Sequence, residues 1–315
     1  MTERYSGETL VRDVIALMKH ASKSASYKPA LLKAIAAIAR RQLRTQISLL
    51  EIGTEFTRMY WNQTVVYHLR QNTTFSKKSE AVRLVEAEAA RGERDLGRLP
   101  HERRRRLDEA MADLLQINVL KAFHVSKPPE MPNIFGWRKP EQHITLQPEI
   151  AALVKNGAAA LDLIGNYFWA EFLEKTNRLV PRIIQKVASN AAKRTSLTKY
   201  VGILRARSDA CFYCERRLDG TVNVHVDHVI PWSFLFEDPL WDLVLACESC
   251  NTKKSDSLPV ESLVMKLIER NEAEADYLRE HVSFMARKDE IEQLYRVALS
   301  VGWPRDWKPT PHALR

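Results

Sequence analysis

The sequence predicts a mainly α-helical protein with a small α+β insert. Apolar residues recur at helical spacing along most of the chain, and glycine, which marks tight turns, is scarce with 10 residues in 315. One stretch alone combines alternating β-branched residues with all four cysteines. The expected organisation is a helical nucleic-acid or partner-binding region over 1–200, a cysteine-bearing domain over 201–260, and a C-terminal helical segment over 261–315 that packs on the body.

The first region is predicted to hold a series of amphipathic helices. Apolar stripes indicate three helices between residues 9 and 60, and two more over 79–95 and 102–122. Helix is expected again from Glu149 to about Asn177 and from Pro181 to about Ala192. Residues 125–148 contain five prolines and are expected to form an extended loop.

Positive charge is concentrated in this first region. Residues 1–200 carry 33 lysines and arginines against 20 acidic residues, whereas residues 201–315 carry 15 against 19. The segment 175–207 has nine basic residues and no acidic one, which favours phosphate contact over a solvated helix face. No stretch is long and apolar enough to span a bilayer, and no apolar signal core is present. We therefore expect a cytoplasmic protein without membrane contact.

The four cysteines form two C-x-x-C pairs within 40 residues: Cys211 with Cys214, and Cys247 with Cys250. A cytosolic chain has little use for disulfide bonds. Such pairs are typical of a tetrahedral site in which each pair supplies two thiolates to one ion, and Zn²⁺ fits four thiolates best. Because four thiolates leave no open position, the predicted zinc is structural. Four buried free thiols or a redox pair are the alternatives.

The residues around the second cysteine pair predict two strands followed by a helix. Residues 221–230 alternate β-branched side chains, residues 241–246 predict a second strand, and residues 247–254 predict a helix. The second cysteine pair opens this helix, so a zinc ion would fix its first turn.

Polar side chains occupy both the first strand and the helix. Asp227 and His228 are adjacent near the end of the strand, and Asn251 follows the last cysteine directly. A bend at the strand end can bring the two neighbours to one site, although adjacent strand residues otherwise face opposite sides. Lys253 and Lys254 follow on the helix and are candidates for phosphate contact.

This segment resembles the HNH endonuclease family, which has the ββα-metal (His-Me finger) fold, in the subtype built on a four-cysteine zinc site. In that family an Asp-His pair is followed by Ile-Pro, then by Asn-Leu, and then by C-x-x-C with Asn or His directly after it. The corresponding residues here are Asp227-His228-Val229-Ile230-Pro231, Asp242-Leu243 and Cys247-Glu248-Ser249-Cys250-Asn251. The resemblance covers roughly residues 205–258.

The resemblance implies a metal-dependent endonuclease that hydrolyses DNA phosphodiester bonds. His228 corresponds to the general base, and Asp227 and Asn251 correspond to the ligands of a catalytic Mg²⁺ (or Mn²⁺) ion. An imidazole that titrates near neutral pH can take a proton from water. An ion held by two protein oxygens keeps positions open for phosphate oxygens and water. The implied products carry a 5′-phosphate and a 3′-hydroxyl.

Asp242 departs from the family pattern, in which an Asn braces the loop between the strands. An Asn side chain donates and accepts hydrogen bonds, whereas an ionised Asp only accepts. His225 shares a strand face with Asp227, so it is a candidate extra ligand or phosphate contact, with packing as the alternative. Arg216 and Arg217, after the first cysteine pair, are further candidates for contact with the DNA backbone.

Two alternatives to an independent nuclease follow. A non-catalytic zinc module that binds nucleic acid or a protein would be expected to lack part of the Asp-His-Asn set, which is complete here. A nuclease subunit that needs activation would rely on an ATPase or sensor protein, since the sequence contains no Walker A pattern. One HNH active site cuts one strand, so cleavage of both DNA strands would need a homodimer or two sequential nicks. The resemblance implies a bacterial restriction, mobile-element or anti-phage defence system.

Overall fold

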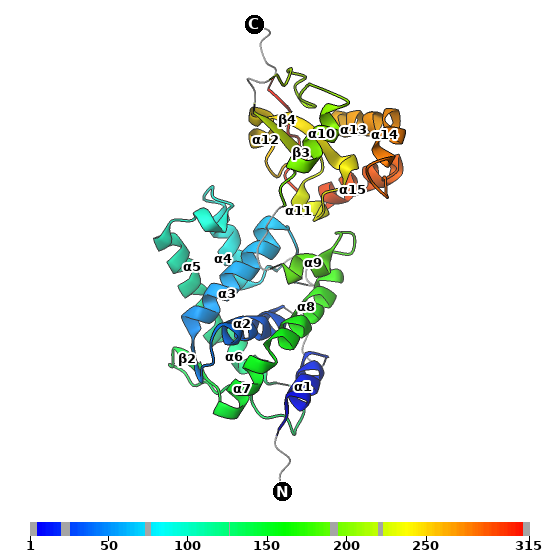
Figure 1. The fold of residues 1–315 in the computed structure, drawn as a ribbon. Helices are drawn as coiled ribbons and strands as arrows, with labels where there is room; N and C mark the ends of the chain where they lie inside the picture. Colours follow the sequence, from blue (N-terminus) through cyan, green and yellow to red (C-terminus); the bar gives the residue numbers. More distant parts are fainter. Residues whose placement is uncertain are drawn as a thin grey trace. The chain divides into compact units, whose positions relative to one another are not determined.

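Helices make up most of the chain and the strands form two small sheets, which confirms the predicted fold class. A computed structural model of the chain describes residues 5–19, 26–72, 77–125, 127–189, 195–219 and 223–310. The chain divides into two units, each with its own core (Figure 1). Unit 1 comprises Met1–Arg178 and Ile183–Ala191, and unit 2 comprises Leu179–Arg182 and Ala192–Arg315.

Unit 1 contains the N-terminal helices. Its α-helices are α1 (Gly7–Lys19), α2 (Tyr27–Arg41), α3 (Leu49–Trp61), α4 (Glu80–Ala89), α5 (His101–Leu114), α6 (Leu120–Phe123), α7 (Pro148–Asn156), α8 (Ala158–Glu174) and α9 (Ile183–Ala188). Two π-helical turns, η1 (Asn62–Val66) and η3 (Leu115–Val119), continue α3 and α5, and η2 (Leu96–Arg98) is a 3-10 turn. Gly157 divides the helix expected from Glu149 onward into α7 and α8.

A short sheet in unit 1 was not predicted. β1 (Gln46–Ser48) pairs antiparallel with β2 (His143–Thr145), with Ile47 opposite Ile144. β1 lies between two helices, and β2 lies in the proline-containing stretch expected to be an extended loop. A three-residue strand is too short to display an alternating pattern, so only its pairing with a distant segment reveals it.

Two glycines allow close helix crossings in unit 1. A Cβ atom at Gly53 of α3 would lie 2.5 Å from the backbone oxygen of Asp108 in α5. A Cβ atom at Gly165 of α8 would lie 2.5 Å from Cγ of Lys33 in α2. Lys33 is 2% exposed, and its Nζ donates to Asn166 of α8 and to the Val187 oxygen of α9. A buried ammonium group therefore ties three helices together.

Unit 2 contains the second sheet. Its elements are η4 (Thr198–Tyr200), α10 (Val201–Arg205), β3 (Val224–His228), α11 (Trp232–Leu235), η5 (Leu240–Asp242), β4 (Leu243–Cys247), α12 (Glu248–Lys254), α13 (Glu261–Ala273), α14 (Ala275–Arg279) and α15 (Lys288–Ser300). β3 and β4 are antiparallel, with Asp227 opposite Val244. α12 packs against both strands (Figure 1). The predicted strand, strand, helix order is therefore present, although Thr221 and Val222 of the first predicted strand lie outside the described residues.

The C-terminal segment belongs to unit 2. After α13 it forms two further helices, α14 and α15, with residues 280–287 between them. Tryptophans hold the tail in place: Trp303 is 2% exposed and packs edge-on against Phe234. The backbone of Trp307 pairs with that of Leu258 and Val260. The tail thus covers the core beside the sheet.

The close contact at Gly53 predicts a specific sensitivity of unit 1. We expect Gly53→Ala to lower the free energy of unfolding by about 1–3 kcal/mol, because the new methyl group would collide with the α5 backbone. Gly7→Ala is the matched control, since its nearest neighbour would be 4.0 Å away. Urea unfolding followed by circular dichroism measures both variants. Equal stability of the two variants would contradict the tight crossing.

Candidate active site and metal centre

The four cysteine side chains lie close together in the structure, although the first pair precedes β3 in the sequence and the second pair follows it. Cys211 and Cys214 lie after α10, Cys247 ends β4, and Cys250 lies in α12. Their Sγ atoms all lie within 4.8 Å of one another, and Cys214 Sγ is 3.8 Å from Cys247 Sγ. Four sulfurs about 2.3 Å from one tetrahedral ion would be about 3.8 Å apart. The cluster therefore fits a structural Zn²⁺ ion.

Burial disfavours the thiolate form of two of the four cysteines unless a cation is bound. It raises the pKa of Cys211 to about 11, and it raises the pKa of Cys250 well above its ordinary value. A bound Zn²⁺ would supply the positive charge that lets all four ionise. The chemistry of the donor set therefore agrees with its geometry.

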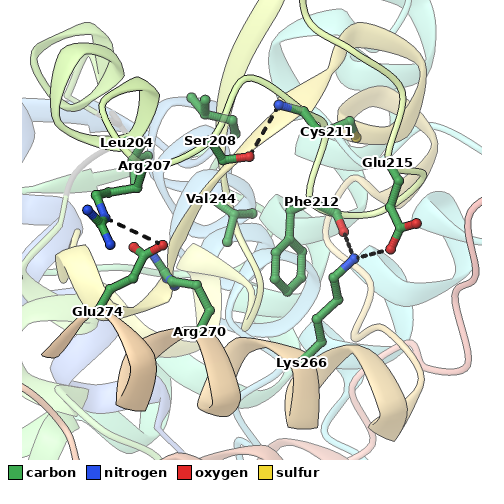
Figure 2. A pocket seen from close by; sticks show the side chains of 12 residues that line it. Leu204, Arg207, Ser208, Cys211, Phe212, Glu215, Val244, Lys266, Arg270 and Glu274 are labelled. Carbon is green, nitrogen blue, oxygen red and sulfur yellow. Dashed lines mark hydrogen bonds and ion pairs between the residues drawn. The ribbon is translucent and has the colours of Figure 1, made fainter.

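The turn that carries Cys211 and Cys214 is held from two sides. Phe212 N donates to the Leu245 oxygen of β4 at 2.8 Å. A pocket of about 310 Å³ lies beside the turn, and Figure 2 shows Lys266 of α13 reaching across it. Lys266 Nζ lies 2.9 Å from the Phe212 oxygen and 2.7 Å from Glu215. These contacts fix the first two sulfurs and the residue between them, Tyr213, relative to the sheet.

Asp227 is a buried carboxylate that receives two donors on one oxygen. It lies in β3 and is 7% exposed. The Tyr213 hydroxyl donates to Oδ2 at 2.6 Å, and Lys254 Nζ lies 3.2 Å from the same oxygen. Burial raises the pKa of Tyr213 well above its ordinary value, so the hydroxyl remains a donor. No described residue forms a hydrogen bond or ion pair with Oδ1, which leaves that oxygen available to a cation.

Lys254 is placed differently from the phosphate contact expected for it. It is fully buried, and its Nζ also donates to the His228 backbone oxygen at 2.5 Å. The last residue of α12 therefore points into the β3 strand and cannot reach a phosphate on the surface. Its neighbour Lys253 is exposed, with Nζ 3.5 Å from Thr310 Oγ1.

His228 is the last residue of β3 and is 3% exposed. Its Nε2 lies 3.1 Å from Asp238 Oδ1, but neither atom has an aligned hydrogen bond to a described residue. The nearby imidazole lowers the pKa of Asp238 below its ordinary value. Asp238 reaches this position because Phe236 ends α11 in a left-handed conformation, and Thr195 Oγ1 donates to its Oδ2 at 2.6 Å.

Asp242 is fully buried and braces the turn after β3. Its Oδ1 accepts from Ile230 N at 2.9 Å, and its backbone oxygen accepts from Val229 N at 3.0 Å. Its Oδ2 has no hydrogen-bond partner among the described residues. Burial raises the pKa of Asp242 well above its ordinary value. A protonated Asp has one accepting oxygen and one donating hydroxyl, so it is a closer match to the expected Asn than an ionised Asp is.

Two of the remaining predicted residues lie on β3 and α12, and two lie after the first cysteine pair. Asn251 is half-buried on α12, and His225 is half-buried on β3 opposite Ala246. Asp227 Oδ1 and the Asn251 side-chain oxygen are the kind of ligand that a hard divalent ion prefers. Arg216 and Arg217 are both exposed, and Arg217 pairs with Asp209 at 3.0 Å.

The described basic residues of the segment 175–207 differ in burial and in their partners. Lys186 is fully buried in unit 1. Three other members have acidic partners: Lys175 with Glu171, Arg182 with Glu237 and Arg207 with Glu274. Lys193 and Arg194 lie outside the described residues. Lys186 is therefore excluded from a phosphate-binding surface, and the interpretation of the rest of the segment stays a prediction.

Three features of the site were not predicted from the sequence: the contact of Tyr213 with Asp227, the contact of Asp238 with His228, and the burial of Lys254. Tyr213 stands between two cysteines, where its hydroxyl could have been noticed as a donor, but nothing in the sequence indicates that it reaches Asp227. Asp238 and the burial of Lys254 depend on the turn after α11 and on the packing of α12, so no local pattern reveals them.

The buried pair of Lys254 and Asp227 predicts a large loss of stability when one partner is removed. We expect Lys254→Met to lower the free energy of unfolding of unit 2 by about 3–5 kcal/mol, because the carboxylate would remain buried without its cation. Lys253→Met is the matched control, and its effect is expected to stay within about 0.5 kcal/mol. Chemical denaturation measures both. Similar small effects in the two variants would show that the pair does not support the fold.

The raised pKa of Asp242 predicts a pH-dependent gain for Asp242→Asn. The folded wild type retains this proton while the unfolded chain releases it above about pH 4, so wild-type stability falls as pH rises toward the folded-state pKa. Asn does not titrate. The variant should therefore gain on the order of 1 kcal/mol or more relative to wild type between about pH 5 and pH 8.

Urea unfolding at several pH values measures this gain. Asp276→Asn is the control, because the Asp276 side chain is fully exposed and its replacement should give no such trend. A constant difference between wild type and Asp242→Asn across the pH range would contradict a protonated Asp242.

Comparison with known proteins supports the assignment of this segment. Residues 211–260 match the family model described as HNH endonuclease. No curated protein and no solved structure shows a significant match to the chain. None of the helices in the described ranges is long and apolar enough to cross a membrane. The matched segment contains all four cysteines together with Asp227, His228 and Asn251, and the resemblance of this part of the chain to the HNH endonuclease family is confirmed.

Proposed function

We propose that the protein is a divalent-metal-dependent endonuclease that hydrolyses DNA phosphodiester bonds. One observation carries the proposal: a segment that matches the HNH endonuclease model has an Asp-His pair on a strand, an Asn on the adjoining helix and a four-thiol cluster. An HNH domain implies a nucleic-acid substrate, and DNA is the substrate that we infer.

In this proposal His228 is the general base. Nε2 faces Asp238 and would carry the ring hydrogen, which leaves Nδ1 to accept a proton from water. Asp238 would hold the ring in this orientation and stabilise the imidazolium that forms. Because His228 is 3% exposed, the surrounding turn also limits how many water molecules reach the imidazole.

Asp227 and Asn251 would hold a Mg²⁺ or Mn²⁺ ion through their side-chain oxygens. When bound, such an ion stabilises negative charge on the scissile phosphate and on the leaving 3′ oxygen. Lys253, Arg216 and Arg217 are exposed and would contact the DNA backbone. His225 would lie on the Asp227 side of β3, as an additional phosphate contact or ligand.

The proposal includes a biological setting. A single site of this kind cuts one strand, so duplex cleavage would require a homodimer or two successive nicks. We infer a role in bacterial restriction or anti-phage defence, in the cytoplasm, with an ATPase or sensor protein as the activating partner. This setting follows from the family resemblance.

Plasmid cleavage by the full chain tests the nuclease proposal. We expect nicking of supercoiled DNA with Mg²⁺ or Mn²⁺ and no cutting with EDTA. His228→Ala should reduce the rate by about 100-fold or more, because general-base catalysis contributes about 10²–10⁴. His281→Ala is the matched control, since His281 is exposed in the same unit and outside the site. The activity of this control should remain unchanged.

Two outcomes would contradict parts of the proposal. A folded, zinc-loaded wild type that cuts neither plasmid nor linear DNA under any of these conditions would contradict DNA hydrolysis by the isolated chain. Cutting that persists in His228→Ala would contradict the assignment of the base. Parallel reactions with RNA show whether the protein cuts DNA, as inferred, or RNA.

A further inference from the structure

Each cysteine pair brings a hydrogen-bond donor to the same oxygen of Asp227. Tyr213 stands between Cys211 and Cys214, and its hydroxyl donates to Oδ2 at 2.6 Å. Lys254 follows Cys250 on the short helix α12, and its Nζ lies 3.2 Å from the same Oδ2. One donor lies within the first cysteine pair and the other follows the second pair in the sequence, but both reach the same oxygen atom.

Tyr213 is held rigidly enough to orient the carboxylate. It is 4% exposed, and the ring of Trp307 meets it edge-on, with 5.0 Å between the ring centroids. The turn around it is fixed to β4 through Phe212 and to α13 through Lys266. Since the ring and its backbone are both supported, the hydroxyl has little freedom to leave Oδ2.

The consequence lies at the other oxygen of Asp227. A carboxylate with both donors on Oδ2 can rotate only by breaking them, so Oδ1 keeps one direction. No described residue bonds Oδ1. Second-sphere hydrogen bonds of this kind fix the orientation of ligands, and removing one typically weakens metal affinity or activity by about 10–100-fold.

We propose that Tyr213 is a positioning residue that fixes Asp227 through Oδ2, so that Oδ1 alone is presented to the catalytic divalent cation. Through Tyr213 the zinc-binding turn controls the affinity of the second metal site, in addition to stabilising the fold. The inference deepens the proposed nuclease function, because it concerns the same site. A purely structural role for the Tyr213 hydroxyl would affect stability and leave the cation affinity unchanged.

Direct binding of Mn²⁺ to the full, zinc-loaded chain tests this inference without relying on cleavage. Electron paramagnetic resonance of free Mn²⁺ gives the dissociation constant for wild type, Tyr213→Phe and Asp227→Ala. We expect one wild-type Mn²⁺ site that Asp227→Ala abolishes and that Tyr213→Phe weakens by about 10-fold or more. Zinc content and the thermal midpoint, measured on the same samples, establish that each variant is folded.

Tyr295→Phe is the matched control. The Tyr295 hydroxyl is also buried in unit 2, and it donates to the Pro259 backbone oxygen at 2.8 Å, away from Asp227. Its removal should leave the Mn²⁺ dissociation constant unchanged, although it removes a hydrogen bond of similar length.

Cleavage then provides a second readout. Tyr213→Phe should need about 10-fold more Mn²⁺ for half-maximal rate, while its rate at saturating Mn²⁺ should recover most of the wild-type value. A loss of rate that no Mn²⁺ concentration restores would overturn a role in positioning the cation ligand.

The outcomes separate this inference from the nuclease proposal. Unchanged Mn²⁺ affinity in a folded, zinc-loaded Tyr213→Phe variant overturns the inference, even if the wild type cuts DNA. The absence of an Asp227-dependent Mn²⁺ site in wild type also overturns it. Weakened Mn²⁺ binding in Tyr213→Phe, together with a wild type that does not cut DNA, supports the inference and contradicts DNA hydrolysis by the isolated chain.

Discussion

The burial of the Asp227 carboxylate is the constraint on which the rest of unit 2 depends. An ionised group that is 7% exposed is costly unless charged and hydrogen-bonding partners compensate it. Lys254 provides the charge, and for that purpose the last turn of α12 must lie against β3. Tyr213 provides the hydrogen bond, and it must project from between two cysteines toward the sheet. The compensation of one carboxylate therefore sets the positions of the helix and of the cysteine turn.

The four-thiol cluster works with this constraint. Its ligands come from the turn before the sheet, from the end of β4 and from α12, so one ion would hold together the same segments that provide partners to Asp227. The cysteine turn, β3, β4 and α12 carry the whole arrangement. The core beneath these four segments is completed by α13, α15 and the tail with Trp303. A small domain with a two-stranded sheet benefits from such a cross-link, since the sheet by itself buries little apolar surface.

Local patterns made the cysteine pairs, the two strands and α12 predictable, because each pattern spans only a few neighbouring positions. The family resemblance added roles to Asp227, His228 and Asn251. The contacts that depend on packing were not predictable: the burial of Lys254, the approach of Asp238 to His228 and the pairing of β1 with β2 join segments whose proximity only the folded chain determines. From the sequence alone every lysine is expected to be exposed, and nothing in it distinguishes Lys33 and Lys254, which are both buried.

The contact between Trp307 and Tyr213 has a consequence for the order in which the site is completed during synthesis. Tyr213 and all four cysteines are translated well before Trp307, so the thiols can bind an ion while the indole that supports Tyr213 is not yet made. The cysteine turn must then be held by its own ion and by β4 until α13, α15 and the tail pack in place. A growing chain would therefore hold zinc early and gain the final orientation of Asp227 late, which would delay the assembly of the proposed cation site until most of unit 2 has folded.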